Sequence, residues 1–193
     1  MKRDSLAERL AAFGFVLVVF PGVDAVAQTS ESPYTSMQVR EIKALSAEQI
    51  ESYRKGQGMG FALAAELNGY PGPKHVLELQ EELELTQDQR QRTEEIFAEM
   101  NRTAEGLGAE IVRLEQELDQ LFVSHTINDQ SLGERTGDIA VLQGRLRAAH
   151  LSAHLEMMNV LSEKQVHQYI QLRGYQGDGH QGHHPGMSHG ESE

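Results

Sequence analysis

Apolar residues between positions 97 and 121 recur at alternating intervals of three and four residues. This spacing places them along one narrow side of an α-helix, the pattern by which a helix packs lengthwise against a partner. The stripe consists of Phe97, Met100, Ala104, Leu107, Ile111, Leu114, Leu118 and Leu121. A helix from Thr86 to about Ser124 would be roughly 58 Å long. Gly106 and Gly108 interrupt good helix formers and are expected to weaken this helix by roughly 1 kcal/mol each.

The segment after this helix carries a matching stripe. Its members are Leu132, Ile139, Leu142, Leu146, Ala149, Ala153, Met157 and Val160. A turn at 126–133, with a capping box formed by Ser131 and Glu134, would join the two helices into an antiparallel hairpin. A second apolar stripe lies on another face of the return helix: Val141, Ala148, Leu151, Leu155 and Met158. We expect the N-terminal helices or a second copy of the chain, giving a homodimer, to cover that face.

The pattern Leu-(Ser/Thr)-x-x-Gln occurs at 45–49, 85–89 and 161–165. In each copy the hydroxyl can accept a hydrogen bond from the amide three residues on, and the Gln side chain can reach back to the cap amide. Helices are therefore predicted to start at Ser46, Thr86 and Ser162. Pro73 suits the first position of a short helix through Leu83. Together with the scarcity of β-branched residues, these signals predict an all-α fold.

The first residues are typical of an export signal. Lys2, Arg3 and Arg9 precede an apolar run at 10–20, and Ala25-Val26-Ala27 matches a signal-peptidase site. Eleven apolar residues span only about 16 Å as a helix, so stable membrane insertion is not expected. An uncleaved anchor is the alternative. We predict cleavage near Ala27 and a periplasmic location.

Composition and sequence pattern divide the whole chain into four segments. We predict a signal peptide at 1–27, a flexible lead-in at 28–44, a helical domain at 45–173 and a disordered, His- and Gly-rich tail at 174–193. The net charge is −12, which disfavours nucleic acid and attracts metal cations and basic polypeptides. The chain contains no cysteine, so neither disulfides nor thiolate ligands are available.

Histidines supply two candidate metal sites. The tail holds His180, His183, His184 and His189, whose imidazoles suit zinc, copper or nickel. His150 and His154 stand one helical turn apart, with Met158 a further turn along. The alternatives are a solvated tail without function and helix histidines that hydrogen-bond locally. His75, His125 and His167 are single residues, interpreted as structural or surface positions.

No motif indicates catalysis. The carboxylate runs at 81–84 and 94–99 are typical of solvated helix faces. Gly56-x-Gly58-x-Gly60 lacks the Lys-Ser/Thr of a phosphate loop. We therefore expect neither an enzyme nor an organic cofactor.

The three Leu-(Ser/Thr)-x-x-Gln boxes, the signal peptide and the hairpin resemble the Spy/CpxP-like periplasmic proteins, which are named for an LTXXQ motif. The stretch 58–73 and the His-rich end are similar to the branch of zinc-resistance-associated proteins and periplasmic heavy-metal sensors. The resemblance covers about residues 45–175 and implies a curved hairpin that pairs with a second copy into a cradle. Metal-sensing members use a His/Met pair spaced like His154 and Met158, together with a His pair on the first helix. This chain has no histidine before His75.

Two functions follow from the residues and the resemblance together. The first is a periplasmic, metal-responsive stress protein that binds a divalent metal for sensing or buffering. The second is an ATP-independent chaperone or adaptor that holds unfolded envelope proteins, or a sensor kinase, on an apolar cradle. The chaperone branch has a basic concave surface whereas this chain is acidic, and the composition of the tail favours the metal-binding function.

Overall fold

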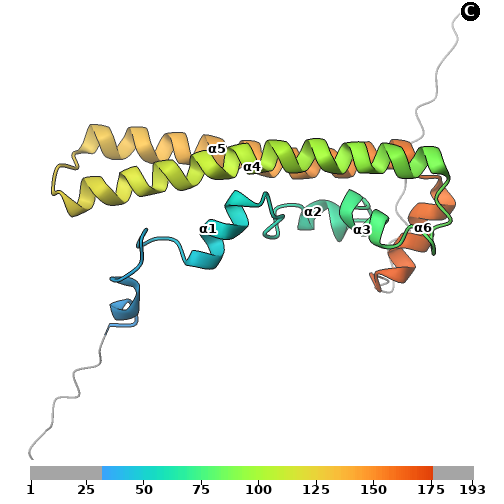
Figure 1. The fold of residues 1–193 in the computed structure, drawn as a ribbon, viewed down its shortest axis with the longest axis horizontal. Coiled ribbons are helices and arrows are strands. Elements are labelled where there is room, and N and C mark those ends of the chain that lie inside the picture. Colours follow the sequence, from blue (N-terminus) through green and yellow to red (C-terminus); the bar gives the residue numbers. More distant parts are fainter. Residues whose placement is uncertain (1–31, 176–193) are drawn as a thin grey trace, which may run out of the picture. The chain divides into compact units, whose positions relative to one another are not determined.

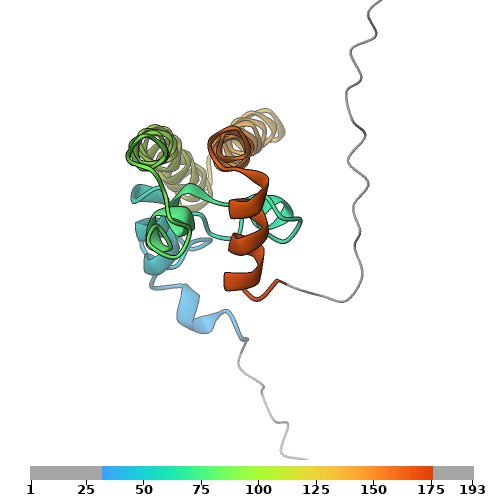
Figure 2. The ribbon, with the colours of Figure 1, turned by 90° about the vertical axis from the view of Figure 1, so that its right-hand side faces the viewer.

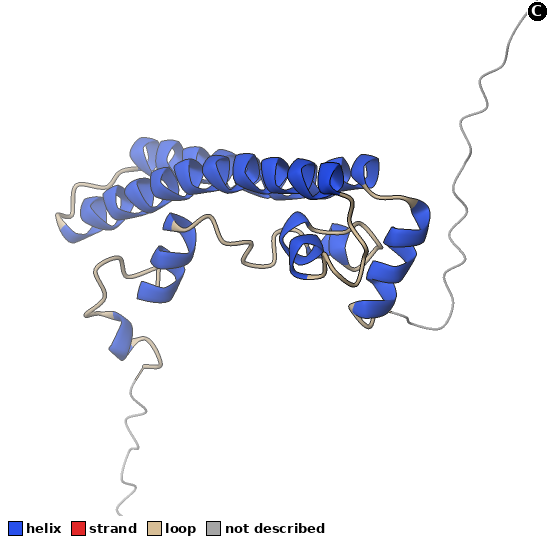
Figure 3. Cartoon of the chain, turned by 45° about the vertical axis from the view of Figure 1, so that its right-hand side comes forward, coloured by secondary structure: helices blue, strands red, loops and turns tan. Residues whose placement is uncertain are grey.

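A computed structural model describes residues 32–175, and all of its regular elements are helices (Figures 1 and 3). They are the 3₁₀ helix η1 (Thr35–Met37), α1 (Ala47–Arg54), α2 (Leu63–Glu66), α3 (Pro73–Glu78), α4 (Gln87–Val123), α5 (Asp129–Val160) and α6 (Glu163–Leu172). Within these residues there is no strand, so the predicted all-α class is confirmed. The signal peptide, the cleavage site and most of the tail lie outside the described residues.

The chain divides into an N-terminal unit, Met1–Thr35, and a main unit that begins at Ser36. In the described part of the first unit, the Thr35 hydroxyl donates to the Ser32 carbonyl at 2.7 Å and closes a turn. All further structure discussed below belongs to the main unit.

The three predicted helix starts are confirmed, because Ser46, Thr86 and Ser162 each cap a helix in a complete capping box. Two of the box glutamines also join helices that are distant in sequence. Gln89 Nε2 donates to Gln165 Oε1 at 2.9 Å, and Gln165 Nε2 donates to Gln89 Oε1 at 3.0 Å. This reciprocal amide pair links the starts of α4 and α6, which no local capping rule predicts.

Two predicted boundaries were wrong. The cap of α5 is Asn128, whose side chain accepts from the Ser131 amide at 2.9 Å, so Ser131 is the third helical residue and not the cap. Asparagine caps as well as serine, and it stands three residues earlier. Helix α3 ends at Glu78 and not at Leu83, and turns follow as far as Glu84, which has a φ of +50°.

Helices α4 and α5 pack side by side as a long pair (Figures 1 and 2). Along the predicted stripe of α4, Ala104, Ile111 and Leu114 are buried and the other members are half-buried. The stripe of α5 is likewise buried or half-buried, except for Leu132 near the turn. The three-four spacing therefore located the contact between the two helices correctly.

The buried surface of α4 is wider than the apolar stripe. Thr93, Ile96, Gly108 and Val112 are also buried, and α1 and α3 pack against α4. The second stripe of α5 was expected to be covered by the N-terminal helices or by a second copy of the chain, and the N-terminal helices leave part of it exposed. Val141 and Leu155 of that stripe are each 57% exposed. Helices α1 and α3 pack mainly on α4, and α2 and α3 also contact α5. Gly108 of α4 permits the close approach of α1.

Glycines and one buried isoleucine fix the N-terminal segments on α4. A Cβ on Gly108 would lie 2.7 Å from the Tyr53 carbonyl carbon of α1, and one on Gly56 would lie 2.9 Å from the Asn101 carbonyl oxygen. Gly56 also has a φ of +60°, which turns the chain after α1. Ile42, in the segment expected to be a flexible lead-in, is 1% exposed and packs with Ile50 and Tyr53.

Candidate functional site

His150 and His154 of α5 are both buried, with 4% and 7% of their surface exposed, and both line one pocket. His154 Nδ1 lies 2.8 Å from the Tyr70 carbonyl oxygen. Because a carbonyl oxygen only accepts, Nδ1 carries the hydrogen, and in the neutral ring Nε2 carries the lone pair. The hydrogen bond joins residues 84 positions apart, so it is not the local bond that the sequence offered as an alternative.

His150 is held by an aromatic neighbour. Its ring stacks on Phe61 with the ring centroids 6.1 Å apart and the planes 23° from parallel. Its Nε2 is buried and has no hydrogen-bond partner among the described residues. Burial, and next the nearby His154, lower the pKa of His150 below its ordinary value.

This pKa shift has a defined consequence for stability. Below about pH 6.5 the unfolded chain takes up a proton at His150 that the folded chain resists. The stability contributed by neutral His150 is therefore fully present above that pH and is lost as the pH falls below it. At neutral pH the ring is an uncharged donor of a lone pair, the form in which imidazole binds metals.

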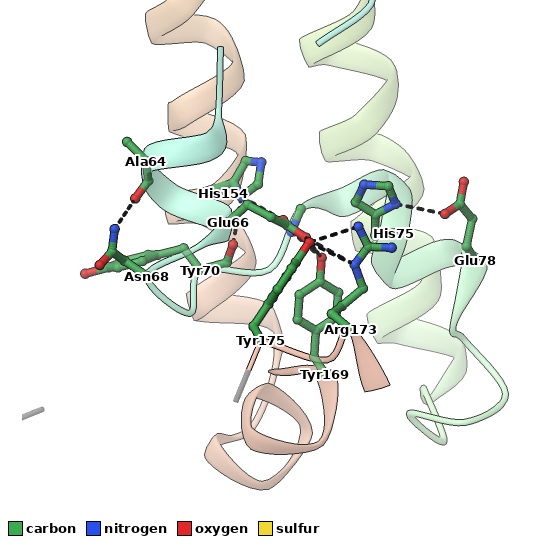
Figure 4. A network of polar contacts seen from close by, with 11 residues as sticks. Ala64, Glu66, Asn68, Tyr70, His75, Glu78, His154, Tyr169, Arg173 and Tyr175 are labelled. Carbon is green, nitrogen blue, oxygen red and sulfur yellow. Dashed lines mark hydrogen bonds and ion pairs between the residues drawn. The ribbon is translucent and has the colours of Figure 1, made fainter. Parts of the chain in front are cut away.

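Glu66, the last residue of α2, lines the same pocket and is 6% exposed. Its Oε1 accepts hydrogen bonds from the Tyr169 hydroxyl at 2.6 Å and the Tyr175 hydroxyl at 3.0 Å, and it forms an ion pair with Arg173 Nε at 3.3 Å (Figure 4). Its Oε2 is buried without a hydrogen-bond partner, 3.7 Å from His154 Nδ1. Glu66 thus has one oxygen that is fully engaged and one that is available.

Tyr169 donates the shorter of the two hydroxyl hydrogen bonds to Glu66. Tyr169 is fully buried, and its hydroxyl also accepts from the Gly72 amide at 3.4 Å. Burial, followed by the hydrogen bond to Glu66, raises the pKa of Tyr169 far above its ordinary value. The hydroxyl therefore stays protonated and remains a donor to the carboxylate.

Gly72 keeps the space beside the two acceptor atoms open. A Cβ at this position would lie 3.1 Å from His154 Nε2 and 3.3 Å from Glu66 Oε2. Any larger residue would fill the volume next to both atoms. Gly72 is also the N-cap of α3, where its φ of −86° requires no glycine, so the close approach is the reason a glycine fits here.

The pocket has a volume of about 650 Å³. Its walls come from the glycine-rich segment 55–60, the start of α3, Phe97 and Met100 of α4, and the two histidines of α5. Two thioethers, Met59 and Met100, therefore line the same space as the imidazoles. Met59 is 39% exposed and has a φ of +42°.

The predicted site residues have different outcomes. His150 and His154 lie together at the pocket, whereas Met158 is half-buried and is not among the residues that line it. His180, His183, His184 and His189 lie outside the described residues. Glu66 and Gly72 were missed. For Glu66 the sequence does offer a signal, a single charged residue within the apolar run 61–67.

The donor atoms suit a metal, but the set is incomplete. Imidazole nitrogens and a carboxylate oxygen are typical ligands of zinc, copper and nickel. However, residues 32–175 contain no group of three or more His, Asp or Glu side chains arranged to hold a metal ion. The fit therefore rests on the unpartnered Glu66 Oε2 and His150 Nε2 and on the space left by Gly72.

No protein-family profile matches the chain, and comparisons with curated proteins and with solved structures find no match. Within residues 32–175, no helix combines the length and the apolar character that crossing a bilayer requires. The function must therefore be inferred from the site itself.

Proposed function

We propose that this chain is a periplasmic, metal-responsive stress protein that binds a divalent metal without catalysis. His150, His154 and Glu66 would form the part of the site that lies in the helical domain. One observation carries the proposal: two buried imidazoles and a carboxylate with an unpartnered oxygen line the same pocket. Burying such groups without partners costs free energy, which a bound cation would offset.

Zinc, copper and nickel are the proposed ions, and no organic cofactor is involved. A bound cation would coordinate Glu66 Oε2 and a ring nitrogen of His150. Because it would bind the folded state only, it would also raise the stability of the protein. His180, His183, His184 and His189 remain proposed ligands on the segment outside the described residues.

Metal binding should depend on the pocket residues. We expect His150→Phe, His154→Gln and Glu66→Gln each to weaken zinc binding at pH 7.5 by about tenfold or more, since even outer partners of metal ligands contribute that much. Competition with a chromophoric chelator measures the affinity. Binding should also fade as the pH falls through about 6.5, where imidazole becomes protonated. The control is His167→Gln on the exposed side of α6.

Unchanged affinity in all three pocket variants would refute the pocket as a metal site. Each variant must therefore first be shown to unfold cooperatively in the presence of a chelator. His150→Phe is the most informative of the three, because phenylalanine preserves the stacking on Phe61 and removes only the nitrogen ligands.

A second candidate function is supported by the exposed apolar residues of the helix pair. Three large apolar side chains of the helix pair are more than half exposed. They are Val141 and Leu155 of α5, and Phe122 near the end of α4. Such a surface is typical of a contact with another polypeptide. It fits a homodimer whose paired copies form a cradle, and it fits a chaperone or adaptor that binds unfolded envelope proteins or a sensor kinase.

The variant Leu155→Glu should disrupt this surface without unfolding the protein, because Leu155 is exposed. We expect it to lower the sedimentation coefficient at micromolar concentration and to reduce suppression of the aggregation of an unfolded client. Ser152→Glu adds the same charge to an exposed position outside the stripe and should change neither. A wild type that sediments as a monomer and does not suppress aggregation would rule out both roles.

A further inference from the structure

The glycine-rich wall of the pocket is tied to both long helices. At its start, a Cβ on Gly56 would lie 2.9 Å from the Asn101 carbonyl oxygen of α4. Just after its end, the Phe61 ring stacks on His150 of α5, with the ring centroids 6.1 Å apart. The residues between these two contacts are therefore fixed at the pocket, and Met59 is one of those that line it.

Met59 stands at a backbone position that rarely holds a side chain of its kind. The Phe61 amide donates to the Gly58 carbonyl at 2.7 Å and closes a tight turn. The two central residues of this turn, Met59 and Gly60, have φ values of +42° and +80°. Turns with a positive φ at both central residues are dominated by glycine, asparagine and aspartate. The backbone conformation therefore does not explain why a methionine is present.

Core packing does not explain Met59 either. Its side chain is 39% exposed, and it belongs to neither of the two buried clusters that the described residues form. Residues held in such uncommon backbone conformations are concentrated at ligand-binding and switch segments. The group that Met59 adds to the pocket is a thioether sulfur, which is soft and polarisable.

Two further uncharged donors line the same pocket from the two long helices. Met100 is half-buried on α4, one position before Asn101, where Gly56 approaches that helix. His150 of α5 has a buried Nε2 without a hydrogen-bond partner among residues 32–175. The pocket is thus lined by two thioethers and an imidazole that come from three separate segments of the chain.

We propose that this pocket binds cuprous copper, with Met59, Met100 and His150 as the ligands. The inference rests on the metal-binding function proposed above and extends it to a monovalent ion that has two different ligands. His150 is common to both ions, whereas Glu66 belongs to the divalent site and the two methionines belong to the copper site.

Ligand softness and charge both favour a monovalent copper ion on these three residues. Thioether sulfur suits soft copper(I), whereas imidazole nitrogen and carboxylate oxygen suit zinc. Two thioethers and a neutral imidazole carry no charge, so the bound ion keeps its own charge beside apolar walls such as Leu63 and Phe97. A single positive charge costs less free energy to bury than a double one.

Methionine-to-leucine substitutions test the copper site, because leucine keeps a similar apolar volume and removes the sulfur. Copper(I) affinity is measured without oxygen by competition with bicinchoninate, and zinc affinity by competition with a zinc chelator. All forms are full-length and share a background in which segment 176–193 supplies no imidazole or thioether. This background carries His180→Ala, His183→Ala, His184→Ala, His189→Ala and Met187→Leu. Thermal unfolding in a chelator verifies that each form is folded.

Met59→Leu and Met100→Leu should each weaken copper(I) binding by about tenfold or more, as loss of groups at a metal site typically does. Both should weaken zinc binding less, and Glu66→Gln should have the opposite selectivity. The control is Met158→Leu, which replaces another half-buried methionine that is not among the residues lining the pocket and should change neither affinity.

Copper(I) affinity that neither methionine variant lowers would overturn the thioether site, and so would an equal loss of zinc affinity in both. Zinc binding that still depends on Glu66 would in that case leave the divalent site standing. Conversely, copper(I) binding that depends on the methionines, with zinc binding that ignores Glu66, would support the copper site and refute the divalent one.

X-ray absorption at the copper edge provides a readout that does not depend on affinity. The copper(I)-loaded protein should show both sulfur and nitrogen bound directly to the metal. Met59→Leu should remove part of the sulfur signal, and Met158→Leu should leave it unchanged. A copper ion surrounded only by nitrogen or oxygen would contradict the proposal.

Discussion

Gly108→Ala should destabilise the protein by about 1–3 kcal/mol, although alanine is the better helix former. The new methyl group would overlap the Tyr53 carbonyl oxygen and lie 2.7 Å from its carbon. Both atoms belong to the backbone of α1, so no side chain can rotate away to relieve the overlap. Overpacking of this kind costs about 1–3 kcal/mol and occasionally more. Chemical unfolding followed by circular dichroism measures the effect.

Gly106 is the matched control because it lies two residues away on the same helix. A Cβ there would meet no atom within 4 Å. Gly106→Ala should therefore stabilise the protein by up to about 1 kcal/mol, the gain in helix propensity. Equal effects of the two substitutions would show that α1 does not pack on α4 at Gly108.

These two glycines show what the sequence could and could not predict. Both were interpreted as weak points of one long helix, since helix propensity depends only on local structure. α4 does run without interruption through both, but the role of Gly108 depends on Tyr53, which lies 55 positions earlier. A contact at that separation leaves no periodic signal in the sequence.

The capping boxes and the candidate site also show that local contacts could be predicted and distant contacts could not. Ser46, Thr86 and Ser162 were predicted correctly as caps, because a box is complete within four residues. The pairing of Gln89 with Gln165 was not predicted, because it joins two boxes 76 positions apart. For the site, helical spacing alone put His150 and His154 on one face.

Glu66 could not be found by spacing. Its partners are Tyr169 of α6 and, beyond the end of that helix, Arg173 and Tyr175, and the Tyr169 contact spans 103 positions. The role of the neighbouring Gly72 could not be predicted either, since its closeness to His154 appears only in the folded chain. Local patterns thus revealed half of the site, and tertiary contacts supplied the carboxylate and the space beside it.

Leu114→Ala should cost about 2–5 kcal/mol of unfolding free energy, as is typical for a buried leucine replaced by alanine. Leu114 belongs to the three-four stripe of α4 and is 3% exposed. The loss combines the transfer free energy of the removed methyl groups with the cavity that rigid neighbours leave behind. Denaturant unfolding at neutral pH measures it, with an unchanged slope indicating that the two-state transition is preserved.

Leu155→Ala is the matched control, the same substitution on the exposed stripe of α5, where the side chain is 57% exposed. In the monomer it should change the unfolding free energy by less than about 0.5 kcal/mol, as surface substitutions do. If a second copy covers that stripe, the effect of Leu155→Ala should instead grow with protein concentration, because dissociation then contributes to unfolding. The effect of Leu114→Ala should not depend on protein concentration, since α4 and α5 of a single chain bury Leu114. A cost for Leu114→Ala below about 0.5 kcal/mol would mean that the stripe is not a packed interface.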